Sequence, residues 1–269
     1  MKKSGFQYHK DTSYDRHNMT GHYLDWRNQP GVFKQYPGVD PVMLPYNVHP
    51  PEMKISSLLK CSHGDASVGS IDLEDLSLIL RLTYSFTAKA RHGGGDFYYR
   101  SVASAGALYP AEIYVAAQGI KGLENGLYHF SIARHSLSLL RKGGIPFSIK
   151  GAKQAAIIKT PILTFFLSAI FFRSAWKYRE RSYRYHLLDT GHLIENLINA
   201  LKSLKLNPAL SLDFDDTEVN RFLGLDETKE VCLAVCHVPE TPAHEDKKPM
   251  EINELPEAVS YTHLRAHET

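Results

Sequence analysis

The chain has 269 residues, which suits one sizeable domain or one domain with long appendages. Its net charge of +2 at pH 7 favours neither a nucleic-acid-binding surface nor an acidic one, and 43% hydrophobic with 22% charged residues is typical of a soluble globular enzyme. The N-terminus has two lysines without an apolar stretch behind them, and the longest apolar run, residues 161–172, is too short to span a bilayer. We therefore expect a cytoplasmic protein that binds neither membrane nor nucleic acid.

The cysteines indicate a reduced protein with structural thiols. Cys232 and Cys236 lie four residues apart on an expected strand, where their side chains would share a face but stand too far apart for an easy disulfide. Neither they nor Cys61 shows the spacing of a zinc site, so we expect no metal.

Residues 1–54 are rich in His, Tyr, Pro and Gly and show no sustained periodicity, which predicts an extended N-terminal arm. Trp26, Phe33 and Tyr36 would fix this arm against a surface, because disordered segments are usually poor in aromatic residues. The sequence leaves open whether that surface belongs to the same domain or to a partner subunit.

Residues 55–60 are apolar at helical spacing, and the first long helix is predicted over residues 71–85. Asp72 can cap it, and Leu73, Leu76 and Leu80 recur at helical spacing behind the cap. The triple glycine at 93–95 cannot continue a helix, and no Lys-Ser/Thr follows it as in a phosphate-binding loop. A hairpin or lid is the better interpretation.

Strands interleaved with helices, hairpin strands among them, predict an α+β domain rather than a doubly wound parallel one. The expected strands are 112–118, 126–132, 136–141, 162–172 and 230–238, and the expected helices are 147–159, 185–204 and one that ends at 222–225.

The helix over 185–204 has the clearest pattern in the chain. Its polar positions, among them Asp189, His192 and Asn199, recur every three or four residues and leave a wide apolar stripe. Such a stripe suits packing inside a core or across a dimer.

The segment RSVASAGALYPAEIY, residues 100–114, is the first candidate for a binding site. Its run of small residues lets the backbone approach a flat ligand with exposed N–H groups, and Arg100 supplies forked donors for a phosphate or a ring edge. The alternative is an ordinary tight loop before a core strand, and local physics alone does not exclude it.

A second candidate is RSAWKYRERSYRY, residues 173–185, which is dense in cations and aromatic rings. Nucleic-acid binding is disfavoured, because the whole chain is nearly balanced in charge and no recognition module surrounds the segment. A solvated helix face with tucked aromatic rings is the structural alternative.

Together these segments resemble the SagB/ThcOx-type flavin dehydrogenases, a branch of the FMN-binding nitroreductase superfamily. The likeness runs in order through RSVASAGALYPAEIYV, GLYHFSIARHSLSLLR, WKYRERSYRYHLLDTGHLIENL and VCLAVCHV, over roughly residues 55–238. The resemblance implies an FMN-binding domain over 55–240 with a mixed sheet flanked by helices, working as a homodimer or as a pseudo-dimer with a second half.

The resemblance also implies the site residues. Lys177 and Tyr178 match the Lys-Tyr pair that assists proton removal in azoline-oxidising members. The residues implied for FMN are Lys60, Arg100, Ser101, Ser104, Ala105 and Gly106. Two departures from the family pattern concern flavin contacts: Lys60-Cys61-Ser62 stands where relatives have Arg-Arg-Ser, and the loop 207–214 has no glycine.

The favoured function is dehydrogenation of azoline rings in a modified peptide. Oxidising an azoline to an azole removes a hydride, which FMN accepts, and a proton, which needs a base. Lys177 could be that base where burial or the adjacent arginines favour its uncharged form, and Tyr178 could donate or relay the proton. The alternatives are an NAD(P)H-dependent nitro or quinone reductase and a non-catalytic flavin-fold half that scaffolds a partner domain.

The C-terminal residues VSYTHLRAHET, 259–269, read as a translated sequencing adaptor, so we expect the natural sequence to have been truncated near Ala258. Residues 241–258 would then be a linker or the start of a lost segment.

Overall fold

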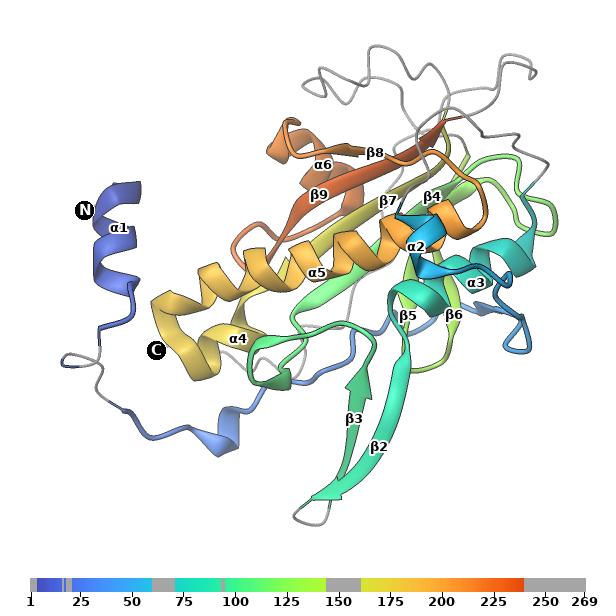
Figure 1. Cartoon of the computed structure of the whole chain (residues 1–269). Helices are drawn as coiled ribbons and strands as arrows, with labels where there is room; N and C mark the ends of the chain where they lie inside the picture. Colours follow the sequence, from blue (N-terminus) through green and yellow to red (C-terminus); the bar gives the residue numbers. More distant parts are fainter. Residues whose placement is uncertain are drawn as a thin grey trace.

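A seven-stranded sheet forms the centre of the computed structural model, which describes residues 4–15, 17, 21–59, 71–92, 95–143 and 161–239 (Figure 1). Neighbouring strands run antiparallel in the order β1-β6-β5-β4-β7-β9-β8. Within the described residues, the one parallel pairing is an isolated bridge between Asp72 and Lys121. The strands are β1 (Pro41–Met43), β4 (Ala111–Ala117), β5 (Gly126–Ser131), β6 (Ser136–Lys142), β7 (Pro161–Ile170), β8 (Ala209–Ser211) and β9 (Glu230–Pro239).

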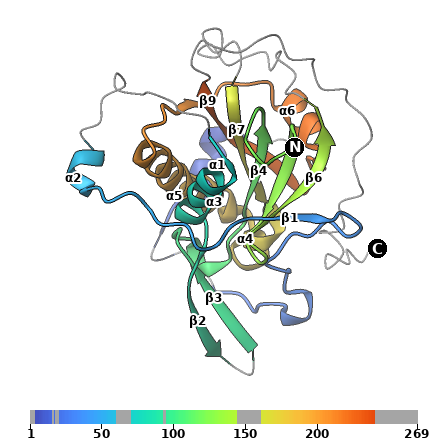
Figure 2. The ribbon, with the colours of Figure 1, turned by 90° about the vertical axis from the view of Figure 1, so that its right-hand side faces the viewer.

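Helices cover both faces of this sheet, so the expected α+β architecture is confirmed (Figure 2). Alternate residues of β4 point to opposite sides: Ile113 and Val115 pack with α3 and α5, whereas Tyr114 packs with α6. The helices are α1 (Gly5–Thr12), α2 (Ile55–Leu58), α3 (Leu73–Thr83), α4 (Phe171–Tyr178), α5 (Ser182–Ser203) and α6 (Asp216–Leu223), with single 3₁₀ turns η1 (Trp26–Asn28), η2 (Ala105–Ala107) and η4 (Arg179–Arg181).

The start of α3 follows from its sequence. The Asp72 side chain accepts hydrogen bonds from the backbone N–H groups of Glu74 and Asp75, and Asp75 reciprocates to the backbone of Asp72. This capping box satisfies donors that the first helical turn cannot satisfy itself. The helix expected over 147–159 lies outside the described residues.

A separate hairpin projects from the body (Figures 1 and 2). It consists of β2 (Phe86–His92) and β3 (Gly95–Arg100), which pair antiparallel. The hairpin prediction for this glycine-rich segment is therefore confirmed. Phe33 of the N-terminal arm packs edge-on against Phe86 and Tyr98 and so fixes its base.

The two C-terminal cysteines correct one expectation. Cys232 and Cys236 are free and buried, but they belong to hydrophobic clusters on opposite faces of the sheet. The register between β7 and β9 shifts after the Leu167–Ala234 pair, and such a bulge inserts an extra residue that reverses the alternation of side chains. Because of this bulge, the two thiols lie on different sides of the sheet although they are four residues apart.

The N-terminal arm packs on its own domain, and it is more structured than its composition indicates. It begins with a helix, α1, which is capped by the Ser4 side chain. Lys34 enters the protein interior, where its Nζ lies 2.6 Å from Glu230 Oε2 and 2.6 Å from the Tyr114 hydroxyl oxygen. The two charged side chains are 1% and 0% exposed. Whether residue 54 bounds a domain stays a prediction.

Replacing Lys34 tests how much this buried pair stabilises the fold. Lys34→Met leaves the Glu230 carboxylate buried without its cation, and breaking such a pair typically costs about 3–5 kcal/mol of unfolding free energy. The matched control is Lys89→Met, which breaks an ion pair with Asp96 in which both side chains are substantially exposed. We expect little or no loss of unfolding free energy there, because water screens an exposed ion pair. Equal losses in the two variants, measured by chemical denaturation, would contradict a stabilising role for the buried pair.

Candidate active site at the Gly106 loop and the end of α4

The loop between β3 and β4 has an unusual backbone. Gly106, Ala107 and Tyr109 all have positive φ, at 62°, 53° and 48°. Only glycine adopts this region without a steric penalty, so the loop needs surrounding contacts to keep the other two residues there. The small residues therefore form a tight, irregular turn before β4.

Asp189 supplies the main contacts. The Ser104 hydroxyl donates to Asp189 Oδ2 at 2.6 Å, and the Ala105 N–H donates to Oδ1 at 3.2 Å. The Ser104 oxygen in turn accepts from the Tyr109 N–H at 2.9 Å. Burial raises the pKa of Asp189, and the hydrogen bonds from Ser104 and Ala105 oppose that shift. One carboxylate of α5 thus fixes the start of the loop, and through Ser104 also its end.

Sequence reasoning assigned Asp189 to the polar side of the helix and missed this role. Asp189 is only 4% exposed. A signal was available, because Asp189, Leu193 and Leu197 are spaced four residues apart and therefore share one helix face. An aspartate in line with two core leucines points to a buried polar contact.

Lys177 and Tyr178 converge on this loop from the end of α4. A Cβ atom placed on Gly106 would lie 2.5 Å from the Tyr178 hydroxyl and 2.9 Å from Lys177 Nζ. Both side chains are half-buried, and Lys177 Nζ lies 5.4 Å from the centre of the Tyr178 ring. The structure therefore brings the adjacent predicted residues Lys177 and Tyr178 to Gly106, which lies more than seventy positions earlier in the sequence.

Tyr178 lies in a ring cluster that keeps its phenol protonated. Its ring centre is 4.6 Å from that of Tyr185 on α5, whose hydroxyl accepts a hydrogen bond from Arg181. Burial, with further contributions from Tyr185 and Asp189, raises the pKa of Tyr178 above its ordinary value of 10.0. At neutral pH this phenol can donate or relay a proton, and it is not a phenolate base.

Two other predicted FMN residues, Ser101 and Arg100, bind protein groups next to the loop. Ser101 bridges the end of α3: its hydroxyl donates to the Thr83 carbonyl at 3.1 Å and accepts from the Ser85 N–H at 3.1 Å. Arg100 is buried, donates to the Tyr84 hydroxyl and to the Val32 carbonyl, and stacks 4.5 Å from the centre of the Tyr109 ring. Its role towards a flavin stays a prediction, as does that of Lys60, which lies outside the described residues together with the predicted C-terminal tail.

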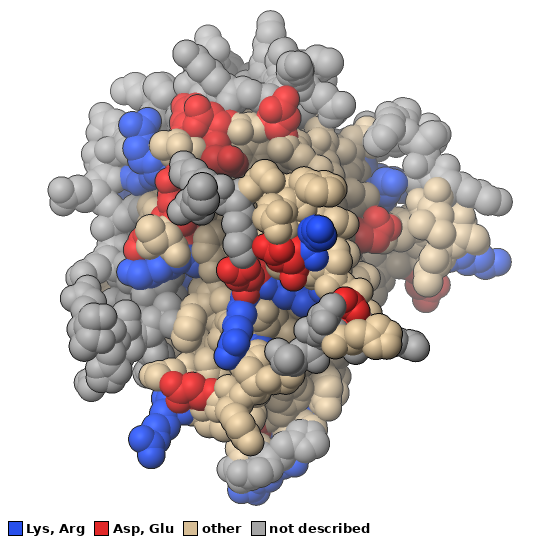
Figure 3. All heavy atoms as spheres, turned by 90° about the vertical axis from the view of Figure 1, so that its left-hand side faces the viewer, with Lys and Arg blue, Asp and Glu red and all other residues tan. Residues whose placement is uncertain are grey.

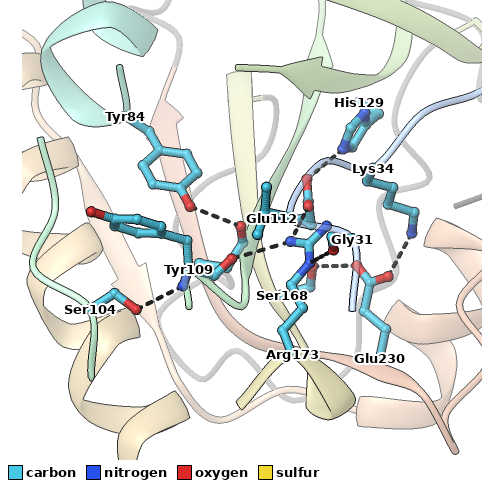
Figure 4. Close-up of polar contacts among 12 residues, drawn as sticks. Gly31, Lys34, Tyr84, Ser104, Tyr109, Glu112, His129, Ser168, Arg173 and Glu230 are labelled. Atoms are coloured by element: carbon cyan, nitrogen blue, oxygen red, sulfur yellow. Dashed lines mark hydrogen bonds and ion pairs between the residues drawn. The ribbon is translucent and has the colours of Figure 1, made fainter. Parts of the chain in front are cut away.

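A second buried ion pair fixes the base of α4. Arg173 donates from Nη1 to Glu112 Oε1 at 2.5 Å and to the Tyr109 carbonyl at 3.2 Å (Figure 4). His129 Nε2 lies 2.8 Å from the other carboxylate oxygen of Glu112. Burial alone would raise the pKa of Glu112, but the charge of Arg173 and the contact with His129 outweigh it and lower that pKa to about 2. Glu112 therefore stays ionised and keeps α4 fixed to the end of the loop.

Two absences apply to the described residues. No cluster of three or more His, Cys, Asp or Glu side chains there could hold a metal ion. The helices in those same segments include none that is long and apolar enough to cross a bilayer.

The Nitroreductase family model matches residues 69–238, which include the Gly106 loop and the end of α4. This chain belongs to the nitroreductase family. A nitroreductase-named protein of Methanocaldococcus jannaschii is 30% identical over 159 residues, 58% of this chain and 76% of that protein. Similarity of structure agrees: an Anabaena variabilis crystal structure described as a nitroreductase has a TM-score of 0.70 and 32% identity, covering 86% of this chain and 45% of that one.

Two further relatives are named for peptide processing. The trifolitoxin-processing protein TfxB of Rhizobium leguminosarum is 28% identical over 185 residues, 65% of this chain. The microcin B17-processing protein McbC of Escherichia coli is 25% identical over 143 residues, 51% of this chain. The chain spans about half the length of these two relatives, 49% and 52%.

Adding one methyl group at Gly106 tests the geometry of the site. In Gly106→Ala the new Cβ meets the tips of Lys177 and Tyr178, and the positive φ adds a penalty of roughly 1–2 kcal/mol. Gly38→Ala is the matched control, because Gly38 also has positive φ but nothing within 4 Å of a Cβ. We expect denaturation to show a larger loss of stability for Gly106→Ala than for Gly38→Ala. Identical losses would mean that the methyl group meets no resistance and that the convergence is wrong.

Proposed function

We propose that this chain is an FMN-dependent dehydrogenase of the SagB type that oxidises azoline rings in a modified peptide. The observation that carries the proposal is the convergence of Lys177 and Tyr178 on the Gly106 loop. Membership of the nitroreductase family supports an oxidoreductase, and the names of TfxB and McbC support a peptide as the substrate. Fold alone would not support this choice, since one fold hosts many activities.

The Gly106 loop is where the proposed cofactor would lie. The tips of Lys177 and Tyr178 occupy the space that a side chain at position 106 would fill, so glycine lets both groups reach the loop backbone. Ser104 and Ala105, whose hydroxyl and N–H groups bind Asp189, would shape the loop against FMN together with Gly106, and Lys60 is the predicted phosphate contact. When bound, FMN supplies a two-electron acceptor for the hydride that leaves the azoline ring.

The proton that leaves the neighbouring ring carbon is handled by the chain itself. Tyr178 is protonated at neutral pH, so the proton acceptor would be Lys177 in its uncharged amine form, or a water that Lys177 binds. Tyr178 then orients the lysine or relays its proton to solvent. Loss of one hydride and one proton converts the ring carbon–carbon single bond into the double bond of the azole, so electrons and atoms balance.

The test is Lys177→Ala, with Lys142→Ala as a matched control because Lys142 is an exposed lysine far along the chain from the site. We expect Lys177→Ala to keep its flavin absorption bands and to oxidise an azoline peptide roughly a hundred- to ten-thousand-fold more slowly. Lys142→Ala should match the wild type. If Lys177→Ala retained full azoline oxidation, the assignment of the proton acceptor would be wrong.

A second candidate is an NAD(P)H-dependent nitro or quinone reductase, which the nitroreductase names of two relatives favour. Such a reaction requires no substrate base, so quinone reduction should be nearly unchanged in Lys177→Ala. A wild type that reduces quinones and leaves azoline peptides unchanged would establish this alternative. Absence of both activities and of flavin would favour the non-catalytic scaffold.

We also propose that the outer face of α5 is covered by a second copy or by a second half of a longer protein. Tyr183, Leu187 and Leu188 on this helix are 46%, 49% and 62% exposed. Exposed leucines side by side on a long helix are more typical of an interface than of a solvated face.

Light scattering at micromolar concentration tests this assembly. We expect a dimer, and we expect Leu188→Glu to convert it into a monomer because a charge would be buried at the interface. The control is Leu212→Glu, at an exposed leucine outside α5. A well-folded wild-type monomer would count against the proposal for this chain.

A further inference from the structure

The N-terminal arm contacts the segment that carries the Lys177–Tyr178 pair. We call residues 173–184, from the base of α4 to the start of α5, the α4–α5 corner. Three contacts from residues 8, 25 and 31 of the arm each join a backbone carbonyl to a side chain. They are the Gly31 carbonyl with Arg173 Nε at 3.0 Å, the Asp25 carbonyl with Trp176 Nε1 at 2.7 Å, and the Glu180 carbonyl with the Tyr8 hydroxyl at 2.9 Å.

Helix α1 binds this corner through its C-terminal end. The last carbonyl groups of a helix have no partner within the helix and carry partial negative charge. Arg184 donates to the His9 carbonyl at 2.8 Å and to the Thr12 hydroxyl at 2.8 Å, and Arg181 donates to the Thr12 carbonyl. Two arginines of the corner thus serve as the C-terminal cap of α1.

The arm is held on the α4–α5 corner by these individual contacts and not by a general attraction between a basic surface and an acidic one. Figure 3 views the side of the molecule on which α1 lies in Figure 1, and basic and acidic side chains are interspersed over it. Docking therefore depends on the individual carbonyl and ring contacts.

The contact nearest to the pair is between two tryptophans. Trp176 directly precedes Lys177, and its ring packs edge-on against Trp26 with 5.3 Å between ring centres. Trp26 remains 67% exposed, so it adds little to the core and contributes mainly through this contact.

The corner needs such support because its backbone is strained. Arg179, immediately after Tyr178, has φ 50° and ψ −136°, which a non-glycine residue rarely adopts. Strain of this kind costs roughly 1–3 kcal/mol and persists only where the surroundings enforce it. The arm provides those surroundings on the outer side, while Glu112 fixes Arg173 on the inner side.

We infer that the arm is a positioning element for the Lys177–Tyr178 pair, and that Trp26 and Trp176 act through the corner rather than on the substrate. This inference rests on the proposed function, because it takes Lys177 and Tyr178 to remove the substrate proton. Stabilisation of the fold is assigned to another part of the arm, around Lys34 and Tyr36, whose side chains are buried. Residues 21–28 should therefore influence the site without determining whether the protein folds.

The test compares Trp26→Ala, Trp26→Phe and Tyr23→Ala in the full chain. Tyr23 is an aromatic residue of the same arm, but its side chain is fully exposed at 102%, so it is the matched control. Hydrogen–deuterium exchange followed by mass spectrometry reports opening of residues 173–184 without requiring any activity. Flavin absorbance, azoline-peptide oxidation and quinone reduction are measured on the same samples.

We expect Trp26→Ala to raise exchange in residues 173–184 by on the order of three- to tenfold, which matches the loss of one aromatic pair. Its kcat for azoline oxidation should fall by roughly ten- to a hundredfold, with KM, flavin content and quinone reduction unchanged, because misplaced groups affect the chemical step. Trp26→Phe should keep exchange in residues 173–184 and the kcat for azoline oxidation close to the wild-type values. Tyr23→Ala should match the wild type.

Wild-type exchange at the corner in Trp26→Ala would overturn the inference. So would a parallel loss of flavin, both activities and unfolding free energy, since that pattern means a purely structural arm. If the wild type itself does not oxidise azoline peptides, the proposed function fails, and the exchange measurement still decides whether the arm positions the corner.

Discussion

Two buried ion pairs, Lys34–Glu230 and Arg173–Glu112, determine how the outer elements sit on the sheet. Both carboxylates belong to the sheet, on β9 and β4, and both cations come from segments packed against it. A buried carboxylate without a cation is strongly destabilising, so each pair permits few arrangements of the arm and of α4. Ser168 and Tyr114 satisfy the remaining oxygen of Glu230, as His129 does for Glu112, and close the network (Figure 4).

The candidate site follows from this constraint. Arg173 binds the Tyr109 carbonyl as well as Glu112, so the end of the Gly106 loop and the start of α4 are fixed to the same point. Asp189 fixes the beginning of the loop from α5. Between these supports Lys177 and Tyr178 meet Gly106, and both segments contain residues with positive φ, at 106, 107 and 109 in the loop and at 179 after α4. Strain stored in this way is common where geometry serves chemistry.

Membership of the nitroreductase family supports an oxidoreductase, and the two proposed reactions make different demands on the site. A lysine and a protonated tyrosine beside a small-residue loop are suited to removing a proton from a substrate while a flat cofactor accepts a hydride. A reductase that passes hydride to a quinone does not need that pair. The distinction between the two proposed reactions therefore depends on the end of α4 and not on the fold.

The sequence by itself determined the elements with strong local signals. The Asp72 cap, the alternating strands and the long periodic helix α5 depend on neighbours a few residues away, so their signals lie within one window of sequence. The small residues around Gly106 could be selected as a site candidate for the same reason, whereas the Lys177–Tyr178 pair was selected through the family resemblance. Tertiary structure alone decided what depends on distant partners: the loop atoms that Asp189 binds, the bulge that separates Cys232 from Cys236, and the burial of Lys34. The partner of a buried charge and the register of a strand depend on residues of other elements. Lys34 is buried because it pairs with Glu230, nearly two hundred positions away, so the residues around Lys34 contain no pattern that predicts its burial.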